Sequence, residues 1–207
     1  ASAPCDRPDP VNYSGRDTNS TAMAAMALVS VGRTTQARAA LRYARNQQNA
    51  DGGFPWFAGG DSDTNSTGLV LAALKSVPAN DRTRTQTKAA RKYLARTQLS
   101  CTAAKSQRGL MPFQGGLGTP DSLGSGQSAL GLLTTLPAAE SPKRGVAITC
   151  DGADKVGSAP VTEALVHALA RTLKANGGLM PNSYGDGADV SASAAAVVAL
   201  RSAGWKP

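Results

Sequence analysis

Four aspartates recur at matching places in a repeated block, and acidic groups placed in this way could bind a ligand or transfer a proton. The clearest copy, residues 48–67, contains Gly-Gly-Phe-Pro-Trp followed by Asp-Thr-Asn-Ser-Thr. Residues 17–21 repeat the second half, and shorter copies lead from Pro112 to Asp121 and from Pro181 to Asp189. A block repeated at intervals of roughly 45–70 residues indicates a repeat architecture.

The segments around these blocks have the patterns of seven helices of two alternating kinds. The nearly apolar segments are residues 20–31, 66–77, 125–136 and 190–203, and the amphipathic ones are residues 35–47, 83–97 and 160–174. A helix that is apolar all round is buried on all sides, whereas an amphipathic one faces solvent on one side. We therefore predict one all-α domain over residues 1–207, with an apolar inner and an amphipathic outer layer, an irregular segment 1–15 and a long loop 137–157.

Each aspartate block begins an apolar helix, which leaves two interpretations open. Asp, Asn, Ser and Thr are strong N-cap residues, and the Gly and Pro of the other half end an outer helix. Alternatively, if all inner helices begin at one rim, the aspartates and the loop aromatics converge on one mouth, as a pocket for a sizeable ligand requires. The candidate ligand-binding residues are Tyr13, Asp17, Asn19, Trp56, Phe57, Asp61, Asp63, Asn65, Phe113, Asp121, Tyr184 and Asp189.

The pattern from Gln48 to Phe54, Gln-x-x-x-Gly-Gly-Phe, resembles the repeat of the squalene cyclase and prenyltransferase superfamily. The helix start from Asp17 to Ala22 resembles the same repeat in transcobalamin-like carriers and in secreted bacterial proteins with prenyltransferase repeats. The resemblance extends from about Asp9 to Ala203 and implies an α/α toroid with a central cavity. The chain supplies about three and a half hairpins, fewer than a complete toroid, which implies a partial ring, a reduced member or one piece of a larger assembly.

The enzymatic chemistries of related toroids lack residues here. A zinc site needs several Cys, His or Asp ligands, and the only histidine, His167, lies in an amphipathic segment. A terpene cyclase would protonate an alkene with the middle Asp of Asp-x-Asp-Asp, and the nearest match, from Asp61 to Thr64, lacks the last Asp. We therefore assign no catalytic residue and no metal site, and we favour binding over catalysis. A cyclase-like enzyme with Asp61 or Asp63 as the acid stays an alternative.

The cysteines and the charge bear on location and partners. Cys101 and Cys150 lie in loop segments, which favours a disulfide between them over inert thiols, and Cys5 would then pair elsewhere. With the processed-looking start Ala1–Pro4 and the heavy use of Ala and Arg, this predicts a secreted or cell-surface protein of bacterial type. The net charge of +8 suits an anionic cell-wall polymer. Nucleic-acid motifs and membrane-spanning apolar stretches are not found, so neither partner is predicted.

Together these patterns predict a secreted binding module whose rim or central cavity holds a bulky amphipathic ligand. The resemblance suggests a corrinoid- or isoprenoid-like molecule, and a cobalamin is the candidate cofactor. The first alternative is a protein-interaction or cell-surface module that completes its ring with another chain. The second is the terpene cyclase-like enzyme.

Overall fold

The computed structural model describes residues 16–133, 145–150 and 159–205. In this part the chain forms seven helices and two short antiparallel hairpins. The helices are α1 (Thr18–Ser30), α2 (Thr34–Arg45), α3 (Thr64–Ser76), α4 (Asp81–Thr97), α5 (Ser122–Leu133), α6 (Val161–Ala175) and α7 (Val190–Ser202). The strands are β1 (Phe54–Pro55) with β2 (Ser62–Asp63), and β3 (Met180–Pro181) with β4 (Ala188–Asp189). The mostly helical chain confirms the all-α prediction.

Every helix begins and ends within three residues of a predicted one. The predicted irregular segment 1–15 lies outside the described residues, as does most of the predicted loop 137–157. The described part of that loop, residues 145–150, contains no helix. Tyr13 and Cys5 also lie outside the described residues.

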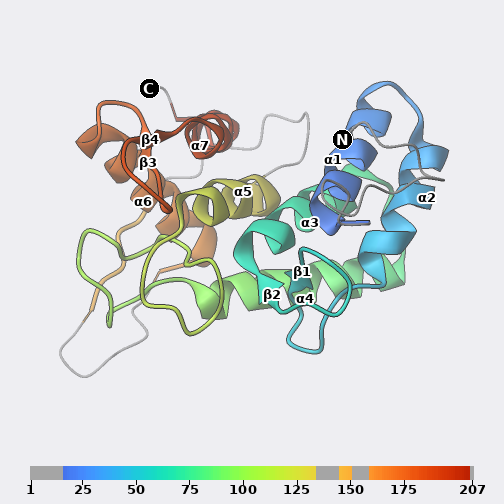
Figure 1. The fold of residues 1–207 in the computed structure, drawn as a ribbon, viewed down its shortest axis with the longest axis horizontal. Helices are drawn as coiled ribbons and strands as arrows, with labels where there is room; N and C mark the ends of the chain where they lie inside the picture. Colours follow the sequence, from blue (N-terminus) through green and yellow to red (C-terminus); the bar gives the residue numbers. More distant parts are fainter. Residues whose placement is uncertain (1–15, 134–144, 151–158, 206–207) are drawn as a thin grey trace.

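The nearly apolar helices stand side by side in one row. α3 packs against α1 on one side and α5 on the other, and α5 packs in turn against α7. The amphipathic helices α2, α4 and α6 each pack against the apolar helix that precedes them in the chain. α1 and α2 lie at one side of the molecule and α6 and α7 at the other (Figure 1).

Burial separates the middle of this row from its ends. On α3, every residue from Thr64 to Leu74 is buried. On the end helices, Met23 of α1 is 58% exposed and Val197 of α7 is 42% exposed. Within the described residues, α1 and α7 each pack against another helix of the row on one side only. The prediction that all four apolar helices are buried all round is therefore wrong for α1 and α7.

Glycines allow the inner helices to approach closely. A Cβ atom on Gly68 of α3 would collide with the backbone of Gln127 and Ser128 on α5, and one on Gly131 would collide with the backbone of Gly68. Gly126 of α5 lies close to α7, where an added Cβ would be 3.0 Å from the Cβ of Ala195. A larger side chain at Gly68 or Gly131 would push the backbones of α3 and α5 apart, so this contact depends on glycine.

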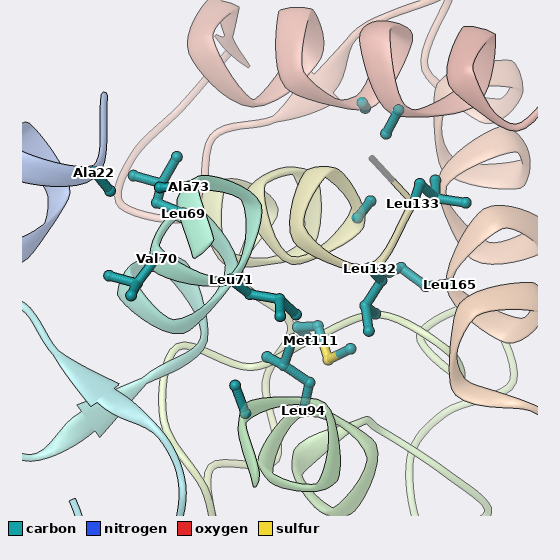
Figure 2. Packing of buried hydrophobic residues seen from close by; sticks show 14 of the residues in the cluster. Ala22, Leu69, Val70, Leu71, Ala73, Leu94, Met111, Leu132, Leu133 and Leu165 are labelled. Carbon is teal, nitrogen blue, oxygen red and sulfur yellow. The ribbon is translucent and has the colours of Figure 1, made fainter. Parts of the chain in front are cut away.

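The core lies between the inner row and the outer helices. Leu71 of α3, Leu94 of α4 and Met111 of the following turn are fully buried, and Figure 2 shows their side chains converging. Leu132 of α5 and Leu165 of α6 extend the same cluster (Figure 2). Burying one Leu side chain stabilises a fold by about 1.5–3 kcal/mol. The outer helices are therefore held to the row mainly by apolar packing.

Cys101 and Cys150 form the predicted disulfide, with Cα atoms 5.8 Å apart. The bridge joins the turn after α4 to the segment that precedes α6, across 49 residues of sequence. In the described part of the chain, no helix is both long enough and apolar enough to cross a lipid bilayer.

Candidate functional site

Each inner helix begins at one of the four repeated aspartates, whose carboxylate accepts a hydrogen bond from a backbone N–H of the first turn. The bond to Asp17 comes from Ser20 at 2.6 Å, that to Asp63 from Ser66 at 2.6 Å, and that to Asp189 from Ala192 at 2.8 Å. Asp121 accepts from Gly124 in the same way. These bonds satisfy N–H groups that a helix leaves unpaired. The capping interpretation of the aspartates is confirmed.

The residue after the aspartate ties each repeat to the next one. The Thr18 hydroxyl donates to the carbonyl of Pro55 at 2.5 Å, and the Thr64 hydroxyl donates to that of Pro112 at 2.6 Å. At the third junction, the backbone N–H of Ser122 donates to the Ser183 hydroxyl at 2.7 Å. We call these bonds the inter-repeat clamp. The sequence signal was the repeated Asp-Thr pair, whose second residue our interpretation treated as part of the cap alone.

A second set of bonds fixes each turn to its own helix. The backbone N–H groups of Phe54, Met111 and Met180 donate to hydroxyls in the first turn or so of the following inner helix. The acceptors are Thr67 at 2.8 Å, Ser125 at 2.9 Å and Ser193 at 2.9 Å. The three donors occupy equivalent repeat positions, and their side chains are fully buried. The residue before the Pro of each block is therefore part of the core of the fold.

We call the side of the row at which α1, α3, α5 and α7 begin the rim. The side-chain amides at the rim also bond to one another. The Asn19 side chain donates to Asn65 at 2.9 Å, and Asn65 donates to the side chain of Gln127. This ladder crosses α1, α3 and α5 and uses much of the polar capacity that the sequence analysis assigned to a ligand. The side-chain Oδ1 of Asn19 is buried and has no hydrogen-bond partner within the described residues.

Three of the four aspartates come together with Tyr184. Burial raises the pKa of Asp63 to about 6, and the nearby carboxylate of Asp121 acts in the same direction against the bonds from Ser66. Partial desolvation, followed by the charges of Asp121, Asp63 and Asp189, raises the pKa of Tyr184 to about 12. Asp63 and Asp121 are only 2% and 4% exposed. These three acids thus lie close enough to Tyr184 for their charges to act on it, and two of them are enclosed.

The aromatic residues of the rim stay open to solvent. Trp56 and Phe57 are 50% and 53% exposed and meet edge to face, with ring centroids 6.1 Å apart. Phe57 pairs by a backbone bridge with Asp17, which places both rings beside the start of α1. Phe113 takes the equivalent place beside the start of α3, where its carbonyl accepts from the Thr64 N–H, and it is half-buried. Tyr184 is largely exposed.

A polar hollow of about 530 Å³ beside the first hairpin escaped the sequence analysis, which named only its exposed Asp61. Asp51 accepts from the Ser62 hydroxyl at 2.8 Å, and Asn49 donates to the same hydroxyl at 3.0 Å. The buried Tyr93 closes the wall by donating to the Ser62 carbonyl at 2.7 Å. Asn49 and Asp51 lie inside the repeated block, so the block itself was the sequence feature that could have indicated this hollow.

Two further sequence expectations concern acid–base and metal chemistry. His167 lies on the outer helix α6, half-buried, where burial and then Arg171 lower its pKa. In the described part of the chain, no group of three or more His, Cys, Asp or Glu residues is placed to hold a metal ion.

No protein-family model matches this chain, and no curated protein matches it. The repeat and the geometry around the starts of the inner helices therefore carry what can be inferred about function.

Proposed function

We propose that this chain is a non-enzymatic binding module whose rim holds a bulky amphipathic ligand against exposed aromatic side chains. The observation that carries the proposal is that the polar groups of the rim are bonded within the protein while its aromatic rings are exposed. The capping aspartates, the clamp hydroxyls and the amide ladder bond to the protein itself, whereas Trp56, Phe57 and Tyr184 remain exposed beside them. Large amphipathic rings supply contact area with few rotatable bonds, as binding surfaces do.

The proposal includes a fold-level part. We propose that the row of inner helices with outer helices packed on it is an arc of an α/α toroid of the squalene cyclase and prenyltransferase superfamily. The repeated clamp supports this, because it holds successive repeats to one another in the same way, as a ring built of repeats requires. On that basis the ligand belongs to the corrinoid- or isoprenoid-like class. The disulfide supports a secreted or cell-surface location.

The polar contacts to the ligand come from fewer residues than the sequence suggested. Asp63 and Asp121 are enclosed, so in this proposal they shape the rim and cap their helices. The exposed Asp61 and the hydroxyl of Tyr184 supply hydrogen bonds to amides or hydroxyls of the ligand. The apolar faces of the ligand lie on Trp56 and Phe57.

The experiment is a thermal-shift titration with cyanocobalamin and, separately, with farnesol. A ligand that binds only the folded state at about 100 times its dissociation constant stabilises the protein by about 2.7 kcal/mol. We expect a shift with one of the two ligands, and we expect Trp56→Ala to remove it. Trp205→Ala is the matched control, since Trp205 lies beyond the opposite end of α7 and should leave the shift intact. No shift with either ligand, or equal loss in both variants, would contradict the proposal.

A further inference from the structure

A groove of about 640 Å³ lies between the end of α3, one face of α4 and the start of α6. Its apolar lining includes Leu74 and Val77, which are buried, and Val161, which is half-buried. In the described part of the chain, neither an acidic nor an aromatic residue lines it. The charged residues that line it are all cations: Lys75, Arg84, Lys88, Arg91 and Lys92. The groove thus combines apolar walls with charge of a single sign.

Two of these cations bond to the end of α5. The Nζ of Lys75 donates to the carbonyls of Gly131 at 3.2 Å and Leu132 at 3.3 Å, and Nη1 of Arg91 donates to the Leu132 carbonyl at 3.2 Å. The last carbonyls of a helix lack intrahelical partners and carry partial negative charge, so cations are stabilising there. Lys75 and Arg91 therefore hold α3 and α4 to α5.

The other three cations, Arg84, Lys88 and Lys92, are exposed and serve no such purpose. Arg84 pairs with Asp81, but both side chains are exposed, and such pairs add little to stability. Lys88 and Lys92 make no hydrogen bond or ion pair within the described residues. Lys88 lies four residues from each of the other two, so the three charges lie on neighbouring turns of α4 and repel one another. A bound anion would replace this repulsion by attraction.

The spacing of these three cations suits an extended ligand. Arg84, Lys88 and Lys92 follow one another along the groove at intervals of about 6 Å, measured along the axis of α4. A chain that carries one negative charge on each short unit can meet all three. The apolar walls strengthen the attraction, because a cleft of low dielectric constant and one sign of charge concentrates the electric field.

We propose that this groove binds an extended phosphodiester polymer of the cell wall, built of units such as glycerol phosphate. Lysines are flexible point charges, which suit a flexible polymer, whereas arginines bind fixed carboxylates in pairs of bonds. The described lining offers no aromatic surface on which the bases of a single-stranded nucleic acid could stack. A polymer chain can lie within the groove, whereas a lipid surface would meet only its exposed edges. The net charge of +8 favours the same class of ligand.

This groove is separate from the aromatic rim. Leu74 lies about 15 Å along α3 from Thr64, where the rim begins. The cell-wall source of the polymer rests on the location proposed above, but the groove uses none of the rim residues. Trp56→Ala should therefore bind the polymer as the parent does, so that either proposal can fail without the other.

The test measures fluorescence anisotropy of a labelled glycerol-phosphate oligomer titrated with the full chain. Lys88→Gln with Lys92→Gln removes two of the three exposed charges. Arg38→Gln with Arg42→Gln is the matched control, because these two are also exposed, four residues apart on an outer helix, and do not line the groove. We expect saturable binding that the lysine pair weakens by about tenfold or more and the arginine pair leaves nearly unchanged.

The dependence on salt gives a second readout. Raising NaCl from about 50 to about 200 mM should weaken binding by about tenfold or more for the parent but by only about threefold for the lysine variant, which releases fewer counterions. Because the lysines repel one another, that variant should melt no lower than the parent by circular dichroism.

An oligomer that does not bind, equal weakening by the two double variants, or a lower melting temperature for the lysine variant would overturn the proposal. Tighter binding of single-stranded DNA of equal charge would identify a nucleic acid as the occupant instead. Binding of phosphatidylglycerol vesicles without binding of the oligomer would identify a membrane surface. Either of these two results also overturns the proposal.

Discussion

α3 and α7 begin with the same cap and stand in the same row, yet they differ in how far their first residues and their eighth residues are buried. In α3, the carboxylate of Asp63 is enclosed, Thr64 is clamped to Pro112, and Leu71 is fully buried. In α7, the cap at Asp189 is half-exposed, and Val190 and Val197 face solvent. The comparison teaches that the repeat encodes a helix start, whereas burial depends on whether a neighbour follows.

The largest expected contrast lies at the eighth residue. Leu71→Ala leaves a cavity in the core and should lower the free energy of unfolding by about 2–5 kcal/mol. Val197→Ala removes a side chain that is already 42% exposed, and it should cost no more than about 0.5 kcal/mol. Urea unfolding measures both. Similar losses at the two positions would show that α7 is covered in solution.

The second largest effect should be the pH dependence of the stability that Asp63 contributes. The folded-state pKa of Asp63 is raised to about 6, above the usual value near 3.9, so the folded state favours the protonated carboxyl. The stability from this group is present below about pH 4 and is lost as the pH rises through about 6, by roughly 2–3 kcal/mol. Asp63→Asn retains a capping side chain and should remove that dependence. Melting curves from pH 4 to 7 that run parallel for the parent and Asp63→Asn would refute the linkage.

The clamp predicts an effect of similar or smaller size. Thr64→Val removes the hydroxyl at nearly constant shape and leaves the buried Pro112 carbonyl without that donor, which should cost about 1–3 kcal/mol. The reverse change at the start of α7, Val190→Thr, meets no following turn within the described residues and should change stability by less than about 0.5 kcal/mol. Both are measured by urea unfolding. Stabilisation by Val190→Thr would indicate that a further repeat does follow α7.

The smallest contrast concerns the caps themselves. Ser193 bonds the Met180 N–H much as Ser125 bonds that of Met111, so the end repeat keeps its internal turn. Asp189→Ala should therefore still cost about 0.5–2 kcal/mol, as the loss of an N-cap does. Thermal unfolding with a Ser191→Ala control, at an exposed position outside the cap bond, measures this. A neutral Asp189→Ala would mean that the last helix is not held by its cap.

The sequence predicted the helices well because their signals are local. Apolar runs, cap residues such as Asp63 and breakers such as Pro55 act over a few residues. The disulfide between Cys101 and Cys150 also followed from loop context and is confirmed.

What the sequence could not predict depends on contacts between repeats. Thr64 lies in a sequence typical of a helix cap, but its hydroxyl donates to the carbonyl of Pro112, 48 residues away. Asn19 and Asn65 suggested ligand contacts, yet they bond to each other across two helices. The exposure of Val197 reflects a neighbour that is missing from the described residues. The one local indication that the start of α7 is exposed was Val190, which stands where the other repeats have Thr or Ser.

The claim that the rim aromatics hold a bulky ligand is tested most directly by native mass spectrometry after incubation with cyanocobalamin or farnesol. We predict one bound ligand per chain for the parent with one of the two compounds, and an unliganded mass for Trp56→Ala under the same conditions. An unliganded parent with both compounds, or equal occupancy in the parent and Trp56→Ala, would contradict the account.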